Sequence, residues 1–258
     1  MKRFFVENLA AKGKKVLITG KELHHLKDVS RLKRGDDIIV FDGKGLEFLG
    51  SIELISKDAA HILLKKQLDT TRESPFEIIL AQGIAKGEKM DFIIQKTTEL
   101  GVSRVIPFVT SRTVPRADKE QAAKKAQRWQ RIALEAAKQC GRNAVPQIEQ
   151  LITFAEVLNT TFPGNKKYLK IISWEAEKKN SIKEILKPDG TSGCIALIGP
   201  EGGFSEAEVN QAKEKGFMPV SLGPRILRAE TAAISMVTII QYELGDMDGL
   251  EKCISENI

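Results

Sequence analysis

Histidine and cysteine are scarce in this sequence, with three residues of each among 258. The cysteines have neither the C-x-x-C spacing of a zinc site nor the even number of a disulfide framework. All three histidines precede residue 62, so the rest of the chain cannot hold a histidine-activated nucleophile or a metal site built from histidine and cysteine. The sequence therefore excludes hydrolysis through a Ser-His-Asp or Cys-His centre there, and it predicts a protein without metal in a reducing, cytoplasmic setting.

Long apolar runs are also absent. No stretch of 18 apolar residues occurs, and the basic N-terminal start lacks the apolar region of a signal peptide. We therefore expect an unprocessed, soluble protein without a membrane partner. Its net charge of +6 is uneven, because residues 1–72 carry 15 Lys/Arg against 10 Asp/Glu. This excess favours a polyanion as partner, although a lysine-rich surface that only maintains solubility explains it equally well.

The first 72 residues predict short β-strands joined by tight turns, interrupted by one helix over 21–32. In that helix, Leu23, Leu26, Val29 and Leu32 share one face. Strands this short are typical of a small closed or partly closed β-barrel. Polar residues then mark a boundary, so we expect domains over 1–72 and 73–258. The N-terminal strands are expected over 3–7, 14–19, 36–41, 46–55 and 61–66.

Beyond residue 72 the expected strands alternate with helices, and this order of elements is typical of an α/β fold with a mostly parallel sheet. The last helix, over 229–244, is apolar nearly all round, so we expect it to be buried in the domain or against a partner. The other helices are expected over 88–101, 117–140 and 181–187. The strands are expected over 76–83, 103–110, 167–174, 194–198 and 217–223.

A glycine-rich loop, GPEGG over residues 199–203, follows the strand over 194–198. Ser205 and Glu208 then match a capping box, which places the loop at the partly positive end of a helix. The loop lacks the Lys-[Ser/Thr] pair of a phosphate loop and the G-x-G-x-x-G of a dinucleotide loop, and no acidic residue ends the strand over 217–223 to bind a ribose. A tight turn without a ligand is the alternative.

A second loop, SLGPRILRAET over 221–231, repeats this arrangement after the next strand. The apolar pair Ile226-Leu227 lies between two arginines in it. An apolar turn of this kind suits an adenine ring held by backbone groups better than it suits a phosphate. The structural alternative is an ion pair of Arg228 with Glu201 or Glu230.

Basic side chains follow the elements in the middle of the chain, where they are spaced to line a groove for phosphates. A solvated helix face explains Lys124, Lys125 and Lys138 equally well. For Trp129 and Trp174 we expect buried packing rather than base stacking. The candidate RNA contacts are Arg3, His25, Arg31, Lys86, Lys89, Arg112 and Arg142.

The segments LIGPEGGFSEAE and SLGPRILRAETA resemble the two cofactor-loop motifs of the ribosomal RNA small subunit methyltransferase E family, within the SPOUT class. The segments RFFV, ELHHLKDVSRLKRGD, QGIAKGEKMDFIIQKTTELGV and EAAKQCGR also fit, with departures at Ser30 and Lys138. The resemblance implies a PUA-like RNA-binding barrel over 1–72 and an α/β methyltransferase domain over 73–258, tied in a trefoil knot around 194–245. It also implies a cytoplasmic homodimer that uses S-adenosylmethionine, without a metal, to methylate N3 of a uridine in small-subunit ribosomal RNA or the 30S particle.

By the same resemblance, the two loops and their flanks would bind the cofactor. The catalytic candidates are Arg228, as the cation that stabilises the anion developing on uridine, and Glu201 or Glu230, which compete with solvent as proton acceptor. Three alternatives stay open: methylation of another RNA base or a ribose hydroxyl, a non-enzymatic RNA-binding factor, and a nucleotide hydrolase that uses GPEGG for phosphate. The cofactor residues implied are Leu197, Ile198, Gly199, Pro200, Glu201, Gly202, Gly203, Leu222, Gly223, Ile226, Leu227, Arg228, Thr231 and Ala232.

Overall fold

The computed structural model describes residues 1–9, 13–69, 72–111, 119–161, 167–187 and 190–247. The chain divides into two compact units. The first contains Met1–Glu73 and Leu134–Val145, and the second contains Ser74–Ala133 and Pro146–Ile258. A boundary drawn at residue 72 would assign Leu134–Val145 to the C-terminal domain, whereas its contacts place it in the first unit.

The first unit is built on a five-stranded sheet in the order β1-β3-β4-β5-β2. β1 pairs with β3 in parallel, and the other pairs are antiparallel. Alternate residues such as Ile38, Val40 and Ile62 point inward and are fully buried. Among the described residues no pairing joins β1 to β2, so the sheet is the curled, partly closed form that the short strands predict. The strands are Arg3–Phe5 (β1), Lys15–Ile18 (β2), Asp37–Phe41 (β3), Glu47–Ile55 (β4) and Ala60–Gln67 (β5).

The helix of the first unit departs from the expected regular pattern. It begins as α1, Gly20–His24, and continues as a π-helical segment, η2, His25–Val29. The N–H of Ser30 donates to the carbonyl of His25, five residues back. Because a π turn contains more residues than an α turn, Val29 is rotated outward and is 63% exposed. The prediction that Val29 shares the buried face of Leu23 and Leu26 is therefore wrong.

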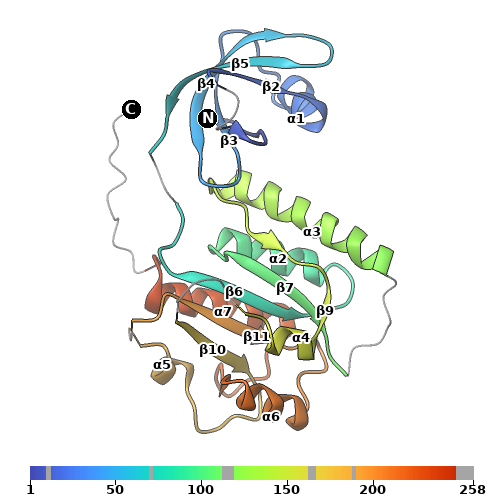
Figure 1. Cartoon of the computed structure of the whole chain (residues 1–258), viewed down its shortest axis with the longest axis vertical. Coiled ribbons are helices and arrows are strands. Elements are labelled where there is room, and N and C mark those ends of the chain that lie inside the picture. Colours follow the sequence, from blue (N-terminus) through green and yellow to red (C-terminus); the bar gives the residue numbers. More distant parts are fainter. Residues whose placement is uncertain (10–12, 70–71, 112–118, 162–166, 188–189, 248–258) are drawn as a thin grey trace. The chain divides into compact units, whose positions relative to one another are not determined.

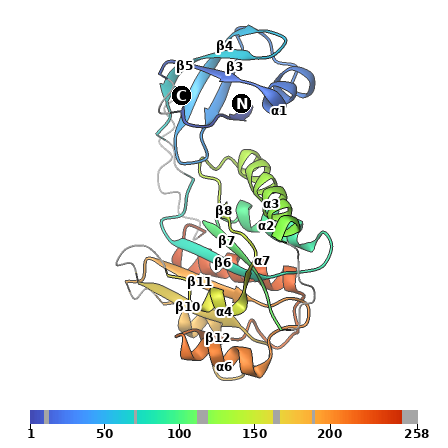
Figure 2. The same cartoon turned by 45° about the vertical axis from the view of Figure 1, so that its right-hand side comes forward.

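The second unit contains a parallel sheet in the order β12-β10-β11-β6-β7-β8, with β9 also paired to β7. Every pairing in it is parallel, which confirms the α/β prediction. Figures 1 and 2 show β10, β11, β6 and β7 side by side. The strands are Glu77–Gly83 (β6), Arg104–Val109 (β7), Gln147–Ile148 (β8), Ile152–Thr153 (β9), Tyr168–Ser173 (β10), Gly193–Ile198 (β11) and Met218–Val220 (β12).

Helices cover both faces of this sheet. The helices α2 (Lys89–Glu99) and α7 (Ala229–Leu244) pack against each other, and α7 also packs against β6 and β11. On the opposite face, residues of α4 (Phe154–Leu158) and α6 (Glu206–Glu214) join an apolar core that contains Phe108 and Phe204. The remaining helices are α3 (Lys119–Cys140) and α5 (Ile182–Ile185).

Only one side of α7 is fully buried. Ala233, Met236 and Ile240 are buried, whereas Tyr242 is 62% exposed. The described residues of this unit thus cover one face of a helix whose sequence is apolar nearly all round. No described helix is both long enough and apolar enough to cross a membrane.

Candidate functional site

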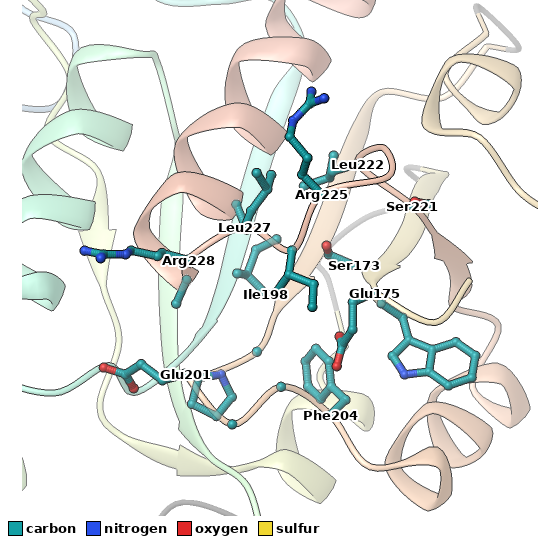
Figure 3. A pocket seen from close by; sticks show the side chains of 18 of the residues that line it. Ser173, Glu175, Ile198, Glu201, Phe204, Ser221, Leu222, Arg225, Leu227 and Arg228 are labelled. Carbon is teal, nitrogen blue, oxygen red and sulfur yellow. The ribbon is translucent and has the colours of Figure 1, made fainter. Parts of the chain in front are cut away.

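The loops that follow three neighbouring parallel strands enclose a cavity of about 360 Å³. These strands are β10, β11 and β12, which lie in the order β12-β10-β11 in the sheet. Because their carboxyl ends meet at one edge, Ser173, Gly199 and Ser221 line the same space although they are far apart in sequence. Figure 3 shows the side chains around this cavity. Its volume is within the range of small-molecule sites.

The first glycine loop is tightly folded against its neighbours. Gly203 has φ +63°, and the N–H of Gly203 donates to the carbonyl of Pro200 over 2.9 Å. A Cβ atom on Gly203 would lie 2.9 Å from Oε1 of Glu175, and one on Gly83 at the end of β6 would lie 2.5 Å from Pro200. Glycine is therefore required at both positions for the loop to adopt this path.

The capping box predicted after this loop is confirmed. The N–H of Glu208 donates to Oγ of Ser205, and the N–H of Ser205 donates to Oε2 of Glu208. The other oxygen of Glu208 accepts hydrogen bonds from the N–H and the hydroxyl of Ser111, which follows β7. Although burial opposes it, these hydrogen bonds lower the pKa of Glu208. Glu208 thereby joins the start of α6 to the end of β7.

Glu201 is held by the segment that precedes and begins α2. Its Oε1 accepts hydrogen bonds from the backbone N–H of Lys86 and from Nζ of Lys89, both at 2.9 Å. Although partial burial opposes it, these contacts lower the pKa of Glu201, so the carboxylate is ionised at neutral pH. Arg228 is exposed on the same side of the cavity, and among the described residues it pairs with neither Glu201 nor Glu230. The predicted alternative of an ion pair at Arg228 is therefore not observed.

The structure brings most of the implied cofactor residues together. All of them line the cavity except Leu197, which is buried in the core, and Thr231, which is exposed. Of the catalytic candidates, Glu201 and Arg228 line the cavity, whereas Glu230 does not. One oxygen of Glu230 is buried and has no hydrogen-bond partner among the described residues.

Several cavity residues were missed by the sequence interpretation. For Ser173 and Trp174 the sequence did contain a signal, because they end the strand expected over 167–174 and ligands bind at the carboxyl ends of parallel strands. Lys89, predicted as an RNA contact, also lines the cavity. Among described residues, no group of three or more His, Cys, Asp or Glu side chains is placed to hold a metal ion. The missed residues are Ser173, Trp174, Glu175, Phe204, Ser221, Arg225 and Ala229.

The residues that line the cavity suit the chemical groups of S-adenosylmethionine. Cβ atoms on Gly199 and Gly203 of the first loop would crowd neighbouring atoms of the site, and Ile226 of the second loop lines the cavity with an apolar side chain that is 86% exposed. The carboxylates of Glu175 and Glu201 offer acceptors for hydroxyl and ammonium donors. These are the groups that the cofactor presents.

Two of the candidate RNA contacts are buried in ion pairs. The guanidinium of Arg142 is 5% exposed, and its Nη2 and Nε lie 2.6 and 2.9 Å from Oε2 of Glu73. Arg3 forms an ion pair with Glu47, stacks over the ring of Phe41, and donates from Nη2 to the carbonyl of Arg142. Both arginines hold the first unit together, a geometry that favours a structural role.

The other candidate RNA contacts differ in exposure. Arg31 and Lys86 are exposed, and His25 is half-buried with its ring 5.7 Å from that of Phe4. Arg112 lies outside the described residues. Because their side chains are exposed, Arg31 and Lys86 are available to bind phosphates and stay candidate RNA contacts.

Three further side chains of the sequence interpretation are packed. Trp129 is 5% exposed, which confirms its predicted burial, and Trp174 packs half-buried against the core. Lys138 is 8% exposed, and its Nζ lies 2.7 Å from Oε1 of Glu22. Lys138 therefore neither belongs to a solvent-exposed helix face nor is available to bind a phosphate, because it is buried and paired with Glu22 inside the first unit.

Comparisons with known proteins cover both units. Residues 72–241 match the family described as RNA methyltransferase domain, and residues 18–65 match RNA methyltransferase PUA domain. Ribosomal RNA small subunit methyltransferase E of Bacillus subtilis is 36% identical over 94% of this chain and 97% of its own length, and that of Mesomycoplasma hyopneumoniae is 35% identical over 92% and 98%. The crystal structure of the Neisseria gonorrhoeae enzyme of that name, bound to S-adenosyl methionine, is 34% identical over 95% of this chain and 99% of that one, with a TM-score of 0.86.

Proposed function

Because this chain belongs to the ribosomal RNA small subunit methyltransferase E family, we propose that it uses S-adenosylmethionine to methylate N3 of a uridine in small-subunit ribosomal RNA. The observation that carries this proposal is the cavity at the ends of β10, β11 and β12. Both glycine loops line it, with Gly199 from one and Gly223 from the other.

The chain has two tasks in this reaction, alignment and proton removal. When bound, the cofactor supplies a methyl group that is already activated by its sulfonium, so no covalent enzyme intermediate is needed. The loops must place uridine N3 in line with that methyl group. As the N3 proton leaves, negative charge spreads to O2 and O4, and the exposed guanidinium of Arg228 is placed to stabilise it.

We assign the N3 proton to Glu201 rather than to Glu230. Glu201 lines the cavity and is ionised at neutral pH, whereas Glu230 does not line it. Lys89 and the N–H of Lys86 occupy Oε1 of Glu201, which leaves Oε2 as the proton acceptor. Lys89 therefore acts on the cofactor loop in this proposal instead of on RNA.

The RNA contacts that we propose are the exposed basic residues. Arg31 in the first unit and Lys86 in the second are exposed, and Arg112 keeps the role expected from the sequence. Affinity for RNA should fall steeply with salt, because each phosphate contact releases counterions.

The proposal includes a cytoplasmic homodimer with a knotted second domain. α7 is apolar but carries exposed Tyr242, and Phe92 on α2 is 46% exposed, so these two packed helices offer an apolar surface for a second copy. The knot is supported by the path of the chain, since β12 lies beyond β10 while the following α7 packs on β11 and β6. Sedimentation equilibrium tests the dimer.

Nucleoside analysis tests the reaction. Small-subunit particles from cells that lack the protein are incubated with it and S-adenosylmethionine, and their RNA is digested for mass spectrometry. We expect 3-methyluridine. A 2′-O-methylated nucleoside or a methylated different base would replace the N3 proposal, and a protein that binds RNA but shows no calorimetric binding of S-adenosylmethionine would be a non-enzymatic factor. Metal-dependent ATP or GTP turnover would indicate the hydrolase.

A further inference from the structure

Glu175 is an exposed residue that lines the cofactor cavity, and its carboxylate has no partner among the described residues. Glu175 follows β10 by two residues and lines the cavity with Ser173. No described residue forms a hydrogen bond or ion pair with it. Figure 3 shows its oxygens turned towards the loop that contains Phe204. The missing Cβ of Gly203 leaves the space that Oε1 of Glu175 occupies, since a Cβ there would lie only 2.9 Å away.

The position of Glu175 in the sheet is that of a ribose-binding acid. β10 pairs in parallel with β11, with Ile172 opposite Leu197, so Glu175 lies two residues beyond the strand that neighbours the one carrying GPEGG. In dinucleotide-binding sheets, an acidic residue near the end of the strand beside the glycine loop binds the ribose hydroxyls. The strand that follows GPEGG in sequence ends without an acid. The strand β10, which lies beside that strand in the sheet and precedes it in sequence, is followed two residues later by the acid Glu175.

The surroundings of Glu175 favour the ribose over the other donors of the cofactor. Glu175 and Ile226 both line this cavity and an adjoining one of about 500 Å³, whereas Glu201 and Arg228 line only the first. Ile226 belongs to the turn expected to cover the adenine, and the ribose is bonded directly to adenine. The ammonium group lies at the opposite end of the molecule, beyond the sulfonium. Figure 3 shows Glu201 and Arg228, beside which the methyl must be transferred, across the cavity from Glu175.

From this geometry we infer that the Glu175 carboxylate accepts hydrogen bonds from the 2′ and 3′ hydroxyls of the cofactor ribose. A vicinal diol presents two donors, and a carboxylate presents two acceptor oxygens that match them. The inference rests on the proposed function, because it names how the same cavity recognises its cofactor. It makes Glu175 a residue that selects a ribonucleoside.

Calorimetric titration tests the inference without any activity measurement. The probes are S-adenosylhomocysteine, its 2′-deoxy form, and 5′-methylthioadenosine, which lacks the amino-acid end. Glu175→Gln should bind S-adenosylhomocysteine and 5′-methylthioadenosine about 10- to 100-fold more weakly, as expected for lost charge-assisted hydrogen bonds. The wild-type protein should reject the 2′-deoxy form by about tenfold or more, and Glu175→Gln should bind both forms alike.

The matched control is Glu184→Gln, which removes a carboxylate that lines only the adjoining cavity and should leave all three affinities unchanged. Thermal unfolding without ligand checks that both variants fold. Unchanged affinities in Glu175→Gln would overturn the inference, as would a loss confined to S-adenosylhomocysteine, which would assign Glu175 to the ammonium group. A wild-type protein that binds neither S-adenosylmethionine nor S-adenosylhomocysteine would instead overturn the proposed function.

Discussion

The Nζ atom of Lys89, the first residue of α2, lies 2.9 Å from Oε1 of Glu201, which belongs to the loop after β11. The backbone N–H of Lys86 donates to the same oxygen. These two hydrogen bonds link the first glycine loop to a segment that is more than 100 residues away in sequence. The loop can therefore be placed before any ligand arrives, and its placement depends on Lys89.

Replacing Lys89 with methionine should weaken cofactor binding more than it weakens the fold. The pair is partly exposed, so its contribution to stability is on the order of 1 kcal/mol or less. The freed loop must be ordered on binding, and we expect calorimetry to show roughly tenfold lower affinity for S-adenosylmethionine. The control is Lys96→Met, which breaks the Lys96–Glu99 pair on the same helix. Equal affinities in the two variants would contradict this role.

The same variant should shift the pH dependence of the reaction. Hydrogen bonds from Lys86 and Lys89 lower the pKa of Glu201 against the effect of burial, so the carboxylate stays ionised below the usual range of a glutamate. Without Lys89 that pKa rises, and the acidic limb of kcat should move to higher pH. Rates measured from pH 4 to 8 would test this. An acidic limb at the same pH in both proteins would remove Glu201 from the mechanism.

Arg228 should act on the chemical step. Arg228→Ala should lower kcat by about 10²- to 10³-fold, the usual effect of losing one group that stabilises developing charge. Calorimetric affinity for S-adenosylmethionine should change much less than kcat, because the proposed role of the guanidinium is to stabilise charge that develops on the uridine. Lys183→Ala, on α5, serves as the charge control. Full kcat with unchanged affinity in Arg228→Ala would make the assignment wrong.

Glu208→Gln should destabilise the second unit in a pH-dependent way. The hydrogen bonds from Ser205 and Ser111 lower the folded-state pKa of Glu208, so its contribution is present above the unfolded pKa and is lost as pH falls through the folded one. We expect a loss of about 1–3 kcal/mol in urea unfolding at pH 7, and less below about pH 4. Glu206→Gln in the same helix turn should show neither effect. A pH-independent loss would indicate a packing defect instead.

Lys138→Met should destabilise the first unit by about 3–5 kcal/mol, because it leaves the carboxylate of Glu22 in a largely buried position without its counter-charge. The matched control on the same helix is Lys124→Met, whose exposed pair with Glu120 should cost less than about 0.5 kcal/mol. Adding Glu22→Met to Lys138→Met should recover part of the loss. Urea unfolding of the three variants tests this, and similar values for Lys138→Met and Lys124→Met would refute it.

Most of the fold follows from local pattern, and the exceptions have identifiable causes. Apolar runs bounded by glycine or polar residues predict β6, β7, β10 and β11 close to their observed bounds. The two-residue strands β8 and β9 are too short to show any period. α4 did have a signal, since Thr153 and Glu156 form a capping box that the sequence interpretation overlooked.

The glycine loops could be predicted because their motifs are local, whereas the rest of the site depends on strand order. Glu175 belongs to the cavity because β10 lies beside β11 in the sheet, and periodicity says nothing about that neighbour. The same limit applies to buried charges. Arg142 and Lys138 find their carboxylate partners 69 and 116 residues away, a pairing that no local pattern reveals.

Leu134–Val145 completes the first unit although Ser74–Ala133 intervenes, which separates the order of folding from the order of synthesis. When the N-terminal strands leave the ribosome, Glu73 and Glu22 still lack the side chains of Arg142 and Lys138 that neutralise them. A nascent chain halted before residue 134 would therefore carry a sheet with uncompensated carboxylates and missing contacts. The strands of the first unit are translated first, but the unit becomes stable only after Leu134–Val145 has been synthesised.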